Sequence, residues 1–136
     1  MPQRGEQGAG ETILIVDDDV AYCAAMGEIL DRAGFKTLSA NSVNEALWIL
    51  TDTKPDVILS DTMMPLTDGG SLLRILRSVD RFRDIPIVTV SARAMPSDKA
   101  EAFAAGANGF LAKPFAAREL LDEIGRHLQR RDQQAA

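Results

Sequence analysis

Residues 57–70 read VILSDTMMPLTDGG, in which an apolar run ends on a carboxylate. The apolar run Val57–Leu59 predicts a strand covered on both faces, because it shows no alternation of polar and apolar residues. The run stops at the carboxylate of Asp61, and Met-Pro and Asp-Gly pairs follow. A plain turn would accept many residues at that position. A charged group at the end of a buried strand therefore indicates a functional site.

Apolar runs of this kind alternate with longer helical patterns along the chain. The predicted strands are Ile13–Val16, Phe35–Leu38, Val57–Leu59, Ile85–Val90 and Gly109–Ala112. The predicted helices are Val20–Ala33, Val43–Asp52, Ser71–Ser78, Asp98–Ala105 and Ala117–Gln129. Five strand–helix units predict an α/β fold in which a doubly wound, five-stranded parallel sheet carries helices on both faces. A closed barrel would need eight such units.

Several single residues carry local expectations. Asp19 is expected at the N-terminus of the first helix, where the helix dipole favours a negative charge. Ser42 and Glu45 form a capping-box pattern for the second helix. Gly34 and Gly106 stand where helices end, at positions that favour glycine.

The apolar faces of the first two helices predict much of the core. In the first helix the core stripe is Tyr22, Met26, Ile29 and Ala33. Trp48 is expected to face the core as well, because Ala46, Leu47, Ile49 and Leu50 surround it in the sequence. His127, the only histidine, is expected on the surface of the last helix without a role.

Length and composition bound the class of protein. The chain has 136 residues, of which 46% are hydrophobic and 26% charged, as in a single globular domain. We expect a flexible leader at 1–11, the domain at 12–129 and a polar tail at 130–136. The net charge of −5 disfavours direct nucleic-acid binding, which needs a basic surface. The single cysteine excludes an internal disulfide, and no apolar run is long enough to span a membrane, so we expect a cytoplasmic protein.

Polar residues gather where the predicted strands end. In a doubly wound sheet, ligands bind outside the carboxyl ends of the strands. Four of the five strands supply a chemically active group there: Asp17, Asp18 and Asp19 after the first, Asp61 after the third, Ser91 after the fourth and Lys113 after the fifth. The second strand ends in Ser39 and Ala40 and is expected to contribute nothing comparable.

Clustered carboxylates repel one another. Two unit charges about 4 Å apart cost about 4 kcal/mol at an effective dielectric constant of about 20. Protonation or a bound cation relieves this repulsion, and oxygen ligands suit Mg²⁺. A bound cation would leave one carboxylate free to attack phosphorus, while a lysine and a hydroxyl contact the phosphoryl oxygens. The sequence therefore predicts an aspartyl-phosphate site with Asp61 at its centre.

Four motifs in this order resemble the receiver domain of two-component response regulators, including the single-domain, chemotaxis-regulator type. They are ILIVDDD at 13–19, LSDTMMPLTDG at 59–69, PIVTVSA at 86–92 and GANGFLAKPF at 106–115. Each motif is weak alone, whereas the set is specific and covers about Thr12–Gln129. The resemblance implies a flavodoxin-like fold with strand order 2-1-3-4-5.

The resemblance also implies a role for each matching residue. Asp61 matches the phosphoacceptor, and the Mg²⁺ ligands would be Asp17, Asp18, Asp61 and the backbone carbonyl of Met63. Lys113 and Ser91 match the residues that contact the phosphoryl group. Ser91 and Phe110 match the switch pair, and the Lys113–Pro114 bond is expected to be cis.

The implied partners are proteins. A sensor histidine kinase or a histidine phosphotransfer protein would donate the phosphoryl group. With the second donor the chain would act within a phosphorelay. A downstream protein would then recognise the changed surface of the fourth helix, fifth strand and fifth helix, and homodimerisation through that surface is left open. The chain would be a phosphoacceptor that takes part in its own phosphorylation and dephosphorylation, not a turnover enzyme.

Three alternatives remain at this point. The chain is expected to be a stand-alone regulator, but a receiver fragment of a larger regulator or hybrid kinase is also compatible. A phosphohydrolase of the haloacid dehalogenase type would use Asp17 with Asp19, Ser91 and Lys113. A receiver that is never phosphorylated would serve only as an interaction module, which the intact set of acids and Lys113 disfavours.

Overall fold

Five strands and five helices alternate along the chain, in the predicted order. The computed structural model describes residues 10–61 and 69–135, and within these it leaves the side chains of 69–71 and 130–135 undescribed. The strands are β1 (Thr12–Val16), β2 (Lys36–Ala40), β3 (Val57–Asp61), β4 (Ile87–Ser91) and β5 (Gly109–Ala112). The helices are α1 (Val20–Arg32), α2 (Val43–Leu50), α3 (Gly69–Ser78), α4 (Pro96–Ala104) and α5 (Ala117–Ala135).

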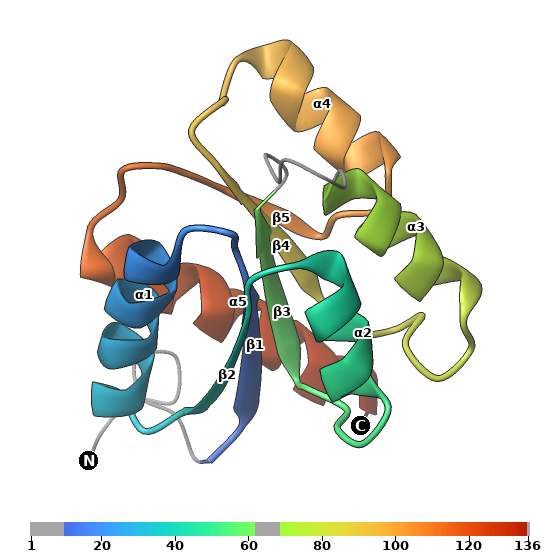
Figure 1. Ribbon diagram of the computed structural model, residues 1–136, viewed down its shortest axis with the longest axis horizontal. Helices are drawn as coiled ribbons and strands as arrows, with labels where there is room; N and C mark the ends of the chain where they lie inside the picture. The colour runs from blue at the N-terminus through green and yellow to red at the C-terminus, as the bar shows by residue number, and fades with distance from the viewer. Residues whose placement is uncertain (1–9, 62–68, 136) are drawn as a thin grey trace.

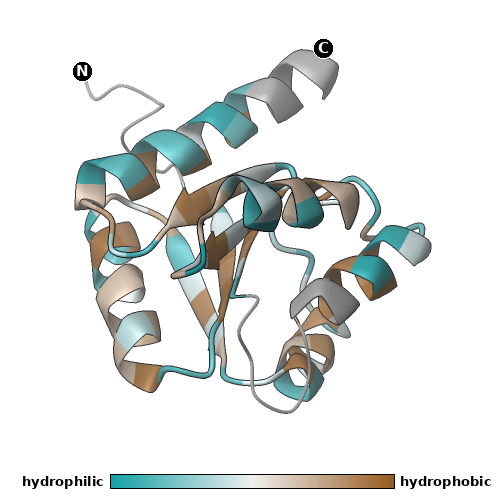
Figure 2. Cartoon of the chain, turned by 90° about the horizontal axis from the view of Figure 1, so that it is seen from above, coloured by the Kyte–Doolittle hydropathy of each residue, from teal (hydrophilic) through white to brown (hydrophobic). Residues whose placement is uncertain are grey.

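The strands form one parallel sheet in the order β2-β1-β3-β4-β5, which confirms the predicted fold. Two hydrophobic layers cover it. One layer packs α1 and α5 against the sheet through residues such as Met26, Leu30, Leu120 and Ile124. The other layer joins α2, α3 and α4 to the opposite face through residues such as Ala46, Leu73 and Ala102. Figure 1 shows the helices on the two sides of the sheet, and Figure 2 shows hydrophobic residues concentrated on the strands between them.

Local signals set most helix ends. The Asp19 side chain accepts a hydrogen bond from the Tyr22 N–H at 3.1 Å and so caps α1. Ser42 Oγ accepts from the Glu45 N–H at 3.0 Å and caps α2. The Glu45 carboxylate reaches the Asn41 N–H at 2.8 Å, so the reciprocal bond is made one residue before the cap. Gly34 has a φ of +96°, which a residue with a side chain would adopt only with strain.

Several boundaries differ from the predicted ones. β3 and β4 continue to Asp61 and Ser91, so these two residues end their strands rather than follow them. β4 begins at Ile87 instead of Ile85: Pro86 has no N–H to donate to the ladder, although its carbonyl accepts the N–H of Ile58 in the neighbouring strand. α4 begins at Pro96, which needs no hydrogen bond at the first helical position. α5 extends past the predicted end at Gln129.

The expectation for Trp48 was wrong. Its side chain is 74% exposed. The buried positions of α2 are Val43, Ala46 and Leu50, whose spacing defines one face of a helix, and Trp48 lies on the opposite face.

His127 is also placed differently from the expectation. It is only 3% exposed, and its Nε2 lies 2.9 Å from Glu123 Oε2 on the same helix. The pair fills space beside Gly109 of β5, where a Cβ atom would lie 2.2 Å from Glu123 Oε2 and 2.6 Å from His127 Nε2. The missing side chain of Gly109 makes room for a buried polar pair that the local sequence of α5 does not indicate.

Arg77 at the end of α3 connects the loops on the amino-terminal side of β4 and β5. Its guanidinium donates to the carbonyls of Gly106 at 3.0 Å, Arg83 at 2.8 Å and Ile85 at 2.9 Å, and also to the side chain of Asn108. A planar group with five donors suits this arrangement. No helix within the described residues is both long and apolar enough to cross a membrane.

Candidate functional site

The parallel register brings the predicted strand-end residues to one edge of the sheet. Asp17 directly follows β1, Asp61 is the last residue of β3, and Lys113 directly follows β5. β1 and β4 both pair with β3, so residues far apart in the sequence emerge together at the carboxyl ends.

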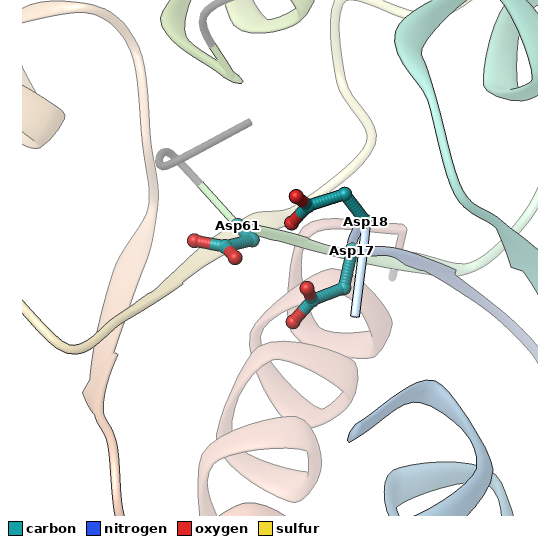
Figure 3. Close-up of side chains that lie close together, drawn as sticks. All are labelled: Asp17, Asp18 and Asp61. Carbon is teal, nitrogen blue, oxygen red and sulfur yellow. The ribbon is translucent and has the colours of Figure 1, made fainter. Parts of the chain in front are cut away.

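Three carboxylates converge there. One oxygen each from Asp17, Asp18 and Asp61 lies within 4.8 Å of the other two. Asp17 and Asp61 are buried, at 0% and 5% exposed, whereas Asp18 is exposed to solvent. Figure 3 shows the three side chains reaching into the same space from β1 and β3. The cluster therefore has a buried inner side and one carboxylate open to water.

Lys113 supplies the positive charge of the cluster. Its Nζ lies 2.8 Å from Asp17 Oδ2 and 3.3 Å from Asp61 Oδ2, and its side chain is 13% exposed. Burial, the largest single influence, lowers the pKa of Lys113. The hydrogen bond to Asp17 and the charges of Asp61 and Asp17 together outweigh burial and raise the pKa above its ordinary value. Lys113 is therefore a cation at neutral pH. Its ammonium links Asp17, which follows β1, to Asp61 at the end of β3.

The backbone and two further side chains hold Asp17. Its Oδ1 accepts the Asp19 N–H at 2.9 Å. Its main-chain carbonyl accepts Asn41 Nδ2 at 2.9 Å and Cys23 Sγ at 3.4 Å. Asn41 directly follows β2, so the second strand end contributes an amide that positions Asp17, although not a carboxylate, hydroxyl or ammonium like those at the other strand ends. Counting one residue past Ala40, where the strand ends, would have found Asn41.

Cys23 is a buried, unreactive thiol by its surroundings. Burial, and next the charge of Asp17, raise its pKa to about 11. A thiolate is the reactive form of cysteine, so the thiol is protonated and inert at neutral pH.

Ser91 lies at this edge, whereas Phe110 lies within β5, two residues before that strand ends. Ser91, which is 1% exposed, ends β4; its Oγ accepts the Arg93 N–H at 3.0 Å, and its carbonyl accepts the Lys113 N–H at 2.9 Å. Phe110 is half-buried in β5 and packs with the layer beneath α4, where Lys99 Nζ lies 5.9 Å from its ring centroid. Ser91 thus adjoins the Lys113 backbone, whereas Phe110 lies on the α4 side of the sheet.

Two further expectations concern single positions. Met63, the expected backbone ligand, lies outside the described residues. The Lys113–Pro114 peptide bond is cis, as the resemblance implied.

The donor set suits a small divalent cation. Three carboxylates and one ammonium leave an excess of negative charge, and all the candidate ligand atoms of the acid cluster are hard oxygens. Mg²⁺ prefers such ligands and keeps several waters, for which the exposed side at Asp18 leaves access. The chemistry of the residues present thus fits a Mg²⁺ site.

The sheet order and the strand-end acids define a flavodoxin-like α/β protein with a charged site at the carboxyl edge. Residues 13–125 match the response regulator receiver domain, and the chain belongs to this family of two-component signalling domains. The haloacid dehalogenase alternative is thereby set aside. Asp19, which it needed at the site, caps α1 instead.

Curated relatives include larger proteins. The chain is 36% identical to the phosphate regulon transcriptional regulatory protein PhoB of Pseudomonas aeruginosa over 121 residues, which cover 89% of this chain and 53% of that protein. It is 38% identical to the transcriptional regulatory protein PrrA of Mycobacterium leprae, over 88% of this chain and 50% of that one. The chain thus spans about half the length of these relatives.

Solved structures of similar size also match. The chemotaxis protein CheY4 of Vibrio cholerae superposes with a TM-score of 0.84 at 32% identity, covering 88% of this chain and 100% of that one. A CheY-like receiver domain protein from Methanospirillum hungatei gives 0.85 at 25% identity, covering 93% and 99%. These likenesses agree with the observed strand order.

Proposed function

We propose that the chain is a phosphoacceptor that receives one phosphoryl group on Asp61. The observation that carries the proposal is the position of the Asp61 carboxylate, which is buried beside the Lys113 ammonium and within 4.8 Å of two further acids. The donor would be a phosphohistidine of a sensor histidine kinase or of a histidine phosphotransfer protein. The family's role in two-component signalling supports this choice.

The residues present support in-line transfer. An oxygen of Asp61 attacks phosphorus, the bond from phosphorus to the histidine nitrogen breaks, and the imidazole leaves with the bonding electrons. The Lys113 ammonium is placed to share the negative charge of the phosphoryl oxygens. Asp17, at 2.8 Å from Nζ, keeps the ammonium at the site.

Magnesium belongs to this proposal. Asp17, Asp18 and Asp61, together with the backbone carbonyl of Met63, would hold the ion. When bound, it supplies positive charge that offsets the carboxylates and the incoming phosphoryl oxygens. The excess negative charge of the cluster is the physical reason to expect it.

The signal would leave through the surface formed by α4, β5 and α5. We propose that the Ser91 hydroxyl turns to the phosphoryl group and that Phe110 moves inward from its half-buried position. The α4 region of this surface exposes Met95 at 66% and Phe103 at 48%, which suits a protein partner. Self-association through the same surface is the competing outcome, and the net charge of −5 argues against direct nucleic-acid binding.

We propose that residues 12–129 act as the receiver domain of a response regulator or phosphorelay protein, with residues 1–11 and 130–136 outside that domain. The curated relatives are about twice as long as the matched region, so the domain is compatible with both a single-domain and a longer regulator. The proposed donors and the single cysteine accord with a cytoplasmic location. The chain would promote its own phosphorylation and dephosphorylation without being a turnover enzyme.

Intact-mass measurement tests the proposal. The chain is incubated with acetyl phosphate with and without Mg²⁺, beside Asp61→Asn and, as a matched control, Asp19→Asn. We expect one added phosphoryl group that requires Mg²⁺, persists in Asp19→Asn and is absent from Asp61→Asn. An unlabelled wild-type chain would favour the interaction-module alternative, and labelling of Asp61→Asn would move the site elsewhere.

A further inference from the structure

The Lys113 ammonium has an aromatic neighbour besides its two carboxylates. Its Nζ lies 4.2 Å from the centroid of the Tyr22 ring. The same atom lies 2.8 Å from Asp17 and 3.3 Å from Asp61. We propose that Tyr22 is a positioning residue whose ring holds the Lys113 ammonium against these two carboxylates.

The fold positions both the backbone and the ring of Tyr22. Tyr22 lies in the first turn of α1, and its N–H donates to the capping Asp19 carboxylate at 3.1 Å. Its ring meets Phe115 edge to face, with the centroids 5.7 Å apart and the planes at 61°. Phe115 follows Lys113 by two residues, so the segment after β5 supplies both the ammonium and the ring that braces Tyr22. The start of α1 and the end of β5 therefore meet through these three side chains.

The electrostatics of the ring suit this role. An aromatic face attracts a cation placed within about 6 Å of its centroid, and the attraction strengthens when water is excluded. The Lys113 side chain is 13% exposed, so most of the solvent that would compete with the ring is absent. A lysine stem has many rotamers, and ordering it costs side-chain entropy. The favourable contact with the Tyr22 ring offsets part of this entropy cost, in addition to the contacts with Asp17 and Asp61.

The burial of Tyr22 differs from that of a residue that serves only in core packing. Tyr22 is only half-buried, and it lies at the margin of its hydrophobic cluster rather than within it. Its ring borders the charged site, whereas Met26 on the same face of α1 is 1% exposed and packs within the core. The ring therefore packs against the edge of the core and also contacts the cation.

The first test detects the contact itself and needs no phosphorylation. The chain has four lysines, and Lys36 and Lys54 are exposed references. In a ¹H–¹³C spectrum the Hε signals of Lys113, identified by their loss in Lys113→Arg, are expected upfield of these references because of the ring current of Tyr22. In Tyr22→Leu they are expected to return toward the references. Lys113 signals that coincide with the references in the wild-type chain would overturn the proposal.

The second test measures the consequence and rests on the proposed function. The rate of labelling by acetyl phosphate with Mg²⁺ is compared in wild type, Tyr22→Leu and Tyr22→Phe. We expect a loss of about threefold to tenfold in Tyr22→Leu, the range of an ordinary cation–π contact, and little change in Tyr22→Phe, which keeps the ring. Mg²⁺ affinity, followed by calorimetry, is expected to stay the same in all three.

The outcomes separate the two proposals. An unchanged rate in Tyr22→Leu, or an equal loss in Tyr22→Phe, would overturn the role of the ring. A parallel loss of Mg²⁺ affinity would also overturn it, because general loosening of α1 would then explain the effect. If the wild-type chain takes no phosphoryl group, the proposed function fails. The lysine spectrum then decides by itself whether the Tyr22 ring contacts the Lys113 side chain.

Discussion

The substitution Asp18→Asn tests the electrostatics of the acid cluster through stability. One oxygen of Asp18 lies within 4.8 Å of Asp17 and Asp61. Coulomb's law gives, at 4.8 Å, a repulsion of about 0.9 kcal/mol in bulk water and about 3.5 kcal/mol at an effective dielectric constant of about 20. Because Asp18 is exposed, the lower figure applies to each of its two pairs, and attraction to Lys113 offsets part of the sum. We expect Asp18→Asn to raise the free energy of unfolding by about 1 kcal/mol without Mg²⁺.

Urea denaturation followed by circular dichroism measures this change, since small domains usually unfold in one step. The matched control is Asp19→Asn, which removes the neighbouring charge but leaves the cluster intact. Asparagine caps a helix about as well as aspartate, and the lost dipole interaction costs a few tenths of a kcal/mol to about 1 kcal/mol. The control is therefore expected to be unchanged or slightly less stable.

Saturating Mg²⁺ should reverse the order. A ligand at a hundredfold excess over its dissociation constant stabilises the folded state by about 2.7 kcal/mol. Wild type should gain this stability, and Asp18→Asn should gain less, because it lacks one ligand oxygen. Loss of stability in Asp18→Asn without Mg²⁺, or an equal rise in Asp19→Asn, would show that repulsion within the acid cluster does not destabilise the folded chain.

Further predictions concern single positions in the fold. Gly109→Ala should lower the free energy of unfolding by about 1–3 kcal/mol, because the new methyl group would displace the buried carboxylate–imidazole pair of α5. Gly27→Ala should raise the free energy of unfolding by up to about 1 kcal/mol, because alanine favours the helix and the new Cβ would meet only one atom, at 3.8 Å. Urea titration of the two variants checks that their stabilities change in opposite directions. The free energy of unfolding should fall as the pH rises from 9.0 to about 11. The pKa of the Cys23 thiol is 9.0 in the unfolded chain and about 11 in the folded chain, so between these values the unfolded chain loses its thiol proton first. That fall should be smaller in Cys23→Ala, and an identical pH profile would contradict it. Arg77→Lys should lower the melting temperature, because an ammonium cannot serve the carbonyls of two loops; an unchanged melting temperature would show that these bonds add nothing.

The architecture and much of the site were predictable because they depend on patterns repeated along the chain. Continuous apolar runs separated by helical segments give a parallel sheet, and parallel strands bring their carboxyl ends to one edge. Asp17, Asp61 and Lys113 could thus be placed together without coordinates. The place of Asp19 at the N-terminus of α1 followed from its position before an apolar helix, and the structure adds that its side chain caps that helix.

The features that were missed depend on contacts that a local pattern does not contain. In α2 the residues around Trp48 are all apolar, so hydrophobicity alone does not indicate which face is buried. The burial of His127 depends on Gly109, which lies in a different element and leaves the space the imidazole fills. Tyr22 fits a core stripe by spacing, and only the path of the chain after β5 brings Lys113 over its ring.

Chemical trapping of the modified residue locates the phosphoryl group on the chain. Borohydride reduces an aspartyl phosphate to homoserine, and peptide mapping by mass spectrometry then locates it. After treatment with acetyl phosphate and Mg²⁺, homoserine is expected at position 61 and at no other aspartate. Homoserine at position 17 or 18, or none in a chain that carries the phosphoryl mass, would show that Asp61 is not the phosphoacceptor.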